Sequence, residues 1–138
     1  MYNSVMEKTY IMIKPDAMAK EGVAAAVKQR ITDAGFVIEN EKVFTLTKEL
    51  VEDHYDFLVE KPFFPEILEF MTSGPVTGMI VVGENVVAKM REIIGVTNPA
   101  NAAPGTIRAE FGTDVMRNVV HGSEDLAAAE IEIKRFFG

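Results

Sequence analysis

The stretch TYIMIKPD (residues 9–16) sets the first element of the fold. Its run of apolar, aromatic and β-branched residues up to Ile13 predicts a buried strand. Pro15 ends that strand because proline has no backbone N–H to donate to a sheet. Lys14 is therefore expected at a strand end, a position at which functional sites are commonly assembled.

Strand and helix patterns alternate along the rest of the chain. Thr47 and Ser123 are predicted N-caps, and Gly35 is a predicted helix end. The predicted helices cover residues 23–35, 48–61, 62–74, 85–95 and 124–137, and the further strands cover residues 36–47, 75–84 and 115–121. Residues 96–114 hold two prolines, two glycines and several small polar residues and are predicted to form one long loop, which in a compact domain is usually functional.

The order of these elements indicates the fold class. It favours an α+β fold, a ferredoxin-like βαββαβ antiparallel-sheet sandwich with added helices and a long loop before the last strand. A doubly wound parallel sheet is the alternative. The sequence contains neither GxxxxGK[ST] nor GxGxxG, so nucleotide binding of the P-loop or Rossmann type is disfavoured.

The composition is that of a single globular domain over residues 1–138, with 48% hydrophobic and 25% charged residues. No apolar run approaches the ~20 residues that span a bilayer, and the first ten residues do not resemble a signal peptide, so we expect a cytoplasmic protein without a membrane segment. The absence of cysteine excludes disulfides, thiolate metal sites and cysteine nucleophiles. A net charge of −7 argues against broad nucleic-acid binding but permits a small anionic ligand in a locally basic cleft.

Histidine is rare in this chain, and His121 stands in the distinctive segment NVVHGSE (residues 118–124). A partly neutral imidazole can act as a nucleophile at physiological pH. The segment places it between a strand end and the N-terminus of the last helix, where backbone N–H groups favour an anion. The other histidine, His54, is predicted to be a helix-surface or half-buried residue without a role. Phe63 and Phe64 are core residues by their spacing, although an exposed phenylalanine at a cleft edge would provide a stacking platform for a nucleobase.

Five segments together resemble the nucleoside diphosphate kinase family. They are IMIKPD (11–16), HYDFLVEKPFF (54–64), FMTSGPV (70–76), GVTNPANAAPGTIR (95–108) and NVVHGSE (118–124), and the resemblance extends over about residues 9–137. It implies an enzyme that transfers the γ-phosphate of a nucleoside triphosphate, mainly ATP, to a nucleoside diphosphate. The implied mechanism is ping-pong, through a phosphohistidine on Nδ1 of His121, with broad tolerance of base and sugar.

The resemblance also implies a role for each matching residue. Lys14 and Asn118 would contact the sugar hydroxyls, with Lys14 also near the transferred phosphate. Phe63 and Val115 would hold the base from its two sides. The expected phosphate ligands are Arg91, Thr97 and Arg108, and the residues expected to surround and orient His121 are Tyr55, Ser123 and Glu132. Magnesium would be held through the nucleotide phosphates without a direct protein ligand, and the chain would form a homo-oligomer, a tetramer or a hexamer.

Two segments depart from the usual family pattern. Glu124 stands where aspartate is commoner, and Ala17 replaces a frequent glycine in a segment that needs one extra residue before Gly22. Two other functions stay open on the sequence alone. One is a sensing or nucleic-acid-binding module that keeps the pocket without turnover. The other is a phosphocarrier that would pass the phosphoryl group to a second protein and ignore GDP.

Overall fold

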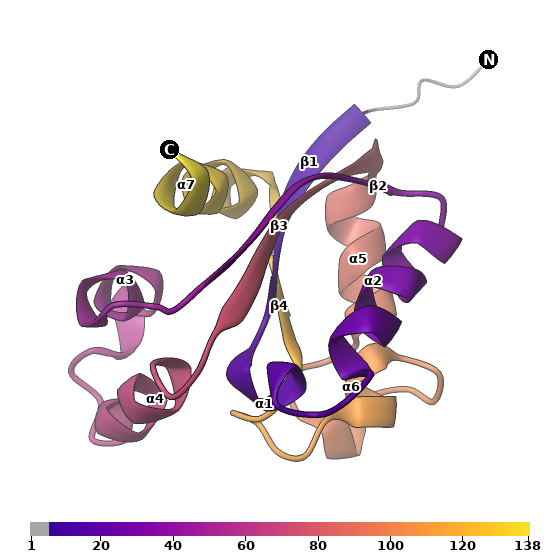
Figure 1. Ribbon diagram of the computed structural model, residues 1–138. Coiled ribbons are helices and arrows are strands. Elements are labelled where there is room, and N and C mark those ends of the chain that lie inside the picture. Colours follow the sequence, from indigo (N-terminus) through magenta and orange to yellow (C-terminus); the bar gives the residue numbers. More distant parts are fainter. Residues whose placement is uncertain (1–5) are drawn as a thin grey trace.

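A four-stranded antiparallel sheet forms the centre of the molecule, as the computed structural model of residues 6–138 shows (Figure 1). The strand order is β2-β3-β1-β4. The strands are β1 (Met6–Ile13), β2 (Val37–Phe44), β3 (Val76–Glu84) and β4 (Val120–Gly122). Every pairing is antiparallel, which confirms the predicted α+β class and excludes the parallel alternative.

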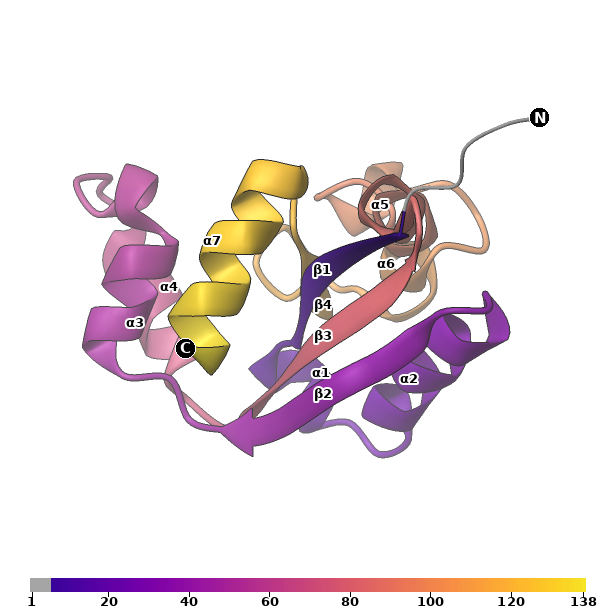
Figure 2. The same ribbon diagram turned by 90° about the horizontal axis from the view of Figure 1, so that it is seen from above.

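The two central strands, β1 and β3, are apolar on both faces because helices cover both faces of the sheet. The helices are α1 (Pro15–Met18), α2 (Val23–Asp33), α3 (Lys48–His54), η1 (Asp56–Leu58), α4 (Phe64–Met71), α5 (Val86–Ile94), η2 (Pro99–Asn101), α6 (Ile107–Phe111) and α7 (Leu126–Phe137). Seen from above, α2 and α5 lie on one side of the sheet, and α7, α3 and α4 lie on the other (Figure 2). Each side has its own hydrophobic core, and residues from Tyr10 to Ile13 alternate between the two.

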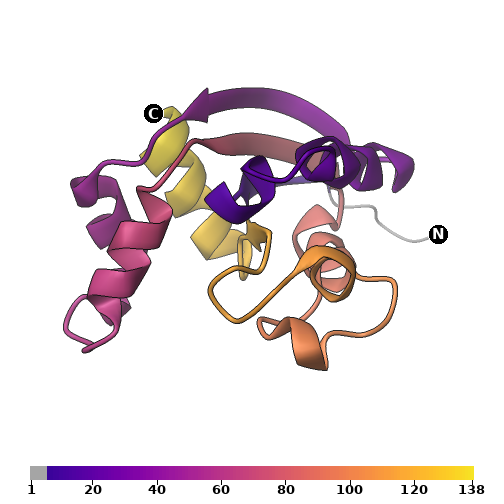
Figure 3. The same ribbon diagram turned by 60° about the horizontal axis from the view of Figure 1, so that its bottom comes forward.

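The segment between α5 and β4 is more structured than the long loop predicted for it. It contains η2, capped by the side chain of Asn98, and α6, capped by Thr106. Figure 3 shows α4 and the segment carrying α6 on opposite sides of the chain that leads into β4. The prediction of a strand from residue 115 is wrong, because only three residues, Val120–Gly122, pair with β1.

Several helix boundaries also differ from those predicted. The helix expected to reach residue 61 ends at His54, and η1 follows. Ser123 is not the cap of α7, because Asp125 accepts the cap hydrogen bond from Ala128 N–H at 2.8 Å. Thr47 does cap α3, accepting from Leu50 N–H. In the unusual segment after Lys14, Gly22 precedes α2 with a φ of 81°, a conformation that glycine adopts without strain.

Candidate active site

A cavity of about 780 Å³ opens beside β4 and brings distant parts of the sequence together. Of the predicted site residues, only Ser123 does not line this cavity. The predicted site residues that line it are Lys14, Tyr55, Phe63, Arg91, Thr97, Arg108, Val115, Asn118, His121 and Glu132. They come from the end of β1, the α3–α4 region, α5 and the α5–β4 segment, β4 and α7, so no single element contains the site.

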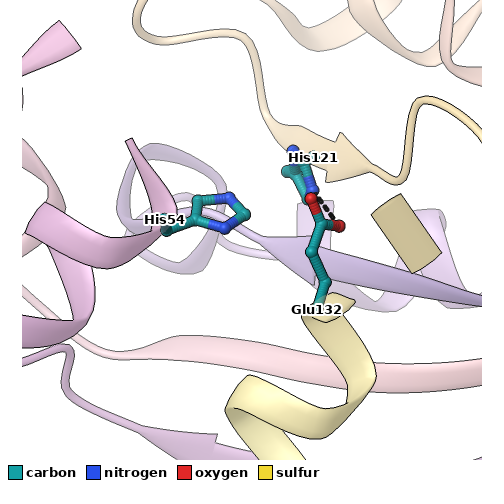
Figure 4. Close-up of side chains that lie close together, drawn as sticks. All are labelled: His54, His121 and Glu132. Atoms are coloured by element: carbon teal, nitrogen blue, oxygen red, sulfur yellow. Dashed lines mark hydrogen bonds and ion pairs between the residues drawn. The ribbon is translucent and has the colours of Figure 1, made fainter. Parts of the chain in front are cut away.

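His121 lies on β4 opposite Met12 of β1, and its ring is held by Glu132. The Nε2 atom lies 2.8 Å from Oε1 of Glu132 (Figure 4). The same carboxylate oxygen accepts a hydrogen bond from Ser123 Oγ at 2.8 Å. Burial alone would raise the pKa of Glu132, but its hydrogen bonds to His121 and Ser123 outweigh burial and lower it. An ionised carboxylate can only accept, so the proton of a neutral His121 sits on Nε2 and the lone pair on Nδ1.

A strained turn places His121. Val119 has a φ of 80°, and Val120 N–H donates to Asn118 O at 2.9 Å, which makes a γ-turn centred on a β-branched residue. Lys14 N–H donates to Val119 O at 2.8 Å, and Val119 N–H donates to Asp16 Oδ2 at 3.0 Å. The segment after β1 therefore binds both the N–H and the C=O of Val119 and holds it in this unfavourable conformation.

Lys14 and Asn118 form a buried polar pair beside the turn. Lys14 Nζ donates to Asn118 Oδ1 at 2.9 Å and to Met116 O at 2.6 Å. Asn118 Nδ2 donates in turn to Thr97 O and Val115 O. Burial lowers the pKa of Lys14 to about 8, so the ammonium is retained near neutral pH at a high cost in solvation.

Two guanidinium groups add positive charge around β4. Arg108 donates to Val120 O at 2.8 Å and to Gly95 O at 3.1 Å, while Arg91 donates to Gly122 O at 3.3 Å. Burial and the nearby Arg91 lower the pKa of Arg108 to about 10, which still leaves it charged at neutral pH. The cations converge on the wall that carries His121, so this part of the cavity suits an anion.

Another part of the cavity lining is apolar and exposed. Phe63 precedes α4 and is 47% exposed, whereas the adjacent Phe64 is 6% exposed and belongs to the core. Of the two roles considered for these phenylalanines, Phe63 thus fits the stacking platform and Phe64 the core residue. Val115 is 58% exposed and also lines the cavity. A cavity with a cationic part and an exposed apolar part complements the anionic phosphates and the flat base of a nucleotide.

His54 is the residue that sequence reasoning missed. It is buried rather than at the helix surface, and its ring centroid lies 4.5 Å from that of His121 in a T-shaped arrangement (Figure 4). Burial, and next the neighbouring His121, lower its pKa from 6.5 to about 3, so the ring is neutral. His54 directly precedes Tyr55 in the segment HYDFLVEKPFF, which was the available signal, but the helix pattern alone does not show that His54 faces the cavity.

A comparison with models of protein families shows which family this chain belongs to. The model of the nucleoside diphosphate kinase family matches residues 7–138. The chain belongs to the nucleoside diphosphate kinase family. Curated relatives named nucleoside diphosphate kinase include those of Symbiobacterium thermophilum, 46% identical over 96% of this chain and 88% of the relative. The relative from Halalkalibacterium halodurans is 48% identical over 96% of this chain and 89% of its own length.

Solved structures of nucleoside diphosphate kinases share the fold. The enzyme from Aquifex aeolicus superposes with a TM-score of 0.91 at 40% identity, covering 97% of this chain and 96% of its own. The Halobacterium salinarum enzyme in complex with CDP also has a TM-score of 0.91, at 37% identity over 96% of this chain and 88% of its own. Across residues 6–138, the chain has no helix of the length and apolar character needed to cross a membrane.

Proposed function

We propose that His121 carries the phosphoryl group in the nucleoside diphosphate kinase reaction of this chain. The observation that supports this most directly is the 2.8 Å contact between its Nε2 and Glu132, which leaves the Nδ1 lone pair as the nucleophile. Members of this family transfer the γ-phosphate of a nucleoside triphosphate to a nucleoside diphosphate through a phosphohistidine. The activity is that of the family, and the assignment to individual residues is our proposal.

The reaction has two half-reactions at one site. In the first, Nδ1 of His121 attacks the γ-phosphorus, the new P–N bond forms as the bond to the β-phosphate oxygen breaks, and the diphosphate leaves. In the second, the terminal oxygen of another diphosphate attacks the phosphohistidine and restores the neutral ring. Phosphoryl transfer needs positioning and charge stabilisation more than proton transfer. Arg91, Arg108 and Lys14 supply the charge, since all three line the cavity.

The remaining nucleotide contacts follow from the cationic and the apolar residues of the cavity lining. Lys14 and Asn118 would hold the sugar hydroxyls, and Thr97 would join the two arginines at the phosphates. Phe63 and Val115 would enclose the base without reading its hydrogen-bonding edge, which explains a broad tolerance of bases. Burial, and next Glu132, raise the pKa of Tyr55, so its hydroxyl stays protonated in the cavity lining.

Magnesium fits the cavity only through the nucleotide. The cavity wall around His121 carries cations, and the carboxylates that line the cavity besides Glu132 are Glu66, Asp114 and Glu124. Glu124 and Glu66 are exposed, so neither forms part of a closed cage. Glu124 would face the water shell of a phosphate-bound ion. When bound, the ion would neutralise phosphate charge. The homo-oligomer and the cytoplasmic location expected from the sequence stay predictions.

Intact mass spectrometry tests the proposal. The protein is mixed briefly with Mg-ATP and measured, then measured again after GDP is added. We expect a gain of one phosphoryl group, which GDP removes with formation of GTP, and no gain in His121→Ala. A gain that GDP does not discharge would favour the phosphocarrier. No gain in a folded protein that binds nucleotide would instead indicate a sensing module.

A further inference from the structure

The ring of His54 makes one hydrogen bond that determines where its proton lies. Arg135 Nη1 on α7 lies 3.1 Å from Nδ1 of His54 on α3. A guanidinium has only donors and stays charged, so it cannot accept a proton from the ring. Nδ1 of His54 must therefore present its lone pair to Arg135. The proton of this neutral ring then sits on Nε2.

The surroundings of His54 keep the ring in one orientation. Tyr55 packs edge-on at 4.7 Å between ring centroids, and Phe136 of α7 packs edge-on at 5.4 Å. His121 lies on a further side at 4.5 Å, with the two imidazole planes 81° apart. A ring fixed in this way forms one wall of the space in which the His121 ring can turn.

His54, His121 and Glu132 also have the spacing of a metal site. One possible ligand atom from each lies within 4.8 Å of the others. Two histidines and a carboxylate are a typical ligand set for zinc. A metal needs a free lone pair on each ring, however. His54 directs Nδ1 to Arg135, and His121 directs a protonated Nε2 to Glu132, so only Nδ1 of His121 is free.

We propose that Arg135 is a positioning residue of the phosphotransfer site. Its guanidinium holds His54 in the Nε2–H form, which keeps that ring as a fixed neutral wall beside His121 and denies the three-residue cluster to zinc. The inference rests on the proposed role of His121 only for its effect on the reaction, because the tautomer and the metal affinity can be measured without turnover.

The charged and titratable groups around His54 are consistent with this role. They are Arg135 and Glu132 of α7, His121 of β4, Lys14 beyond β1, and Tyr55 next in the chain. Without the guanidinium, Nδ1 of His54 would lose its donor, and the ring could shift its proton to Nδ1 and turn Nε2 into a metal ligand. Zinc on the cluster would then occupy the imidazole that must be phosphorylated.

Three variants separate these effects. Arg135→Leu removes the donor and keeps much of the side-chain volume, Arg135→Lys restores a cationic donor, and the double variant Arg135→Leu with His54→Phe removes the second ring. Nitrogen NMR of the imidazoles reports the tautomer directly. Zinc affinity of nucleotide-free protein is measured by competition with a chromophoric chelator.

We expect wild-type His54 to show a protonated Nε2 and an unprotonated Nδ1. Arg135→Leu should lose this pattern and bind zinc about tenfold more tightly, a change of the size that hydrogen-bond partners of metal ligands cause. It should also be phosphorylated more slowly by ATP, with unchanged affinity for the nucleotide. Arg135→Lys should restore all three properties toward wild type, and the double variant should lose the gain in zinc affinity.

A protonated Nδ1 in wild-type His54, or zinc affinity in Arg135→Leu equal to that of wild type, would overturn the proposal. Failure of His121 to accept phosphate, with these two results as expected, would instead refute the proposed function.

Discussion

Glu132 on α7 contacts His121 on β4 through a single 2.8 Å interaction between Oε1 and Nε2, eleven residues apart in sequence. The same oxygen accepts from Ser123, which is anchored to β1 because its Oγ accepts from Tyr10 N–H at 3.1 Å. The orientation of the nucleophile thus depends on a chain of hydrogen bonds that ends at the central sheet.

Glu132→Gln should slow phosphorylation of His121 without unfolding the protein. A neutral amide can donate as readily as accept, so it no longer selects the ring form with a free Nδ1. Loss of a hydrogen bond to a charged group costs about 1.5–3 kcal/mol, or roughly 10–100-fold in rate. Single-turnover phosphorylation by ATP measures the effect. A rate equal to that of wild type would show that Glu132 does not orient the ring.

His121→Ala should fold normally and have no detectable turnover. The side chain is 22% exposed and lines the cavity rather than filling a core, so its removal leaves little unpacked apolar surface. Thermal unfolding and the coupled transferase assay are the two measurements. A large drop in the unfolding temperature would point to a structural role for the ring.

Phe63→Ala should raise KM for purine and pyrimidine nucleotides by a similar factor. Stacking on an aromatic ring is worth about 1–3 kcal/mol per base and does not depend strongly on which base is stacked. Phe57→Ala is the matched control, because Phe57 also lines the cavity and is 71% exposed but has no assigned role. A change confined to purines, or an equal effect at Phe57, would contradict the assignment.

Asp16→Ala should destabilise the turn that carries His121. The Asp16 carboxylate is the acceptor for Val119 N–H in a strained, buried turn, and an unpaired buried donor costs about 1–3 kcal/mol. Urea unfolding should show this loss, together with slower phosphorylation. Asp33→Ala is the control, since the Asp33 carboxylate accepts only an exposed bond from Gln29. Equal stability of the two variants would show that the hydrogen bond from Val119 to Asp16 does not stabilise the turn.

The buried His54 should make stability depend on acid pH. Its folded-state pKa of about 3 lies below the ordinary 6.5, so between these values the unfolded chain binds a proton that the folded chain does not. Stability therefore falls as the pH falls below 6.5, by at most about 1.4 kcal/mol per pH unit. The measurement is urea unfolding at several pH values for wild type and His54→Phe. Parallel pH profiles would show that His54 does not titrate as inferred.

Local patterns in the sequence were enough for the centre of the fold. Thr9–Ile13 is an unbroken run because β1 is covered on both faces, and Thr47 caps α3 as its side chain permits. The predicted boundaries of the last strand were wrong because tertiary contacts override the local sequence pattern there. Val119 has a φ of 80° in a γ-turn that Asp16 and Lys14 hold, so the extended strand cannot continue through it and only Val120–Gly122 pair with β1.

The sequence alone pointed to most of the residues that the structure brings together at the cavity, since the motifs around Lys14, Phe63, Arg108 and His121 are short and specific. Only the tertiary structure decided how some residues act. Ser123 supports Glu132 instead of capping α7. His54 faces His121 and receives a hydrogen bond from Arg135, 81 residues away. Helix periodicity records which face of a helix is buried, but it carries no information about the partner on the opposing element, and that partner sets both the proton position and the orientation of a histidine ring.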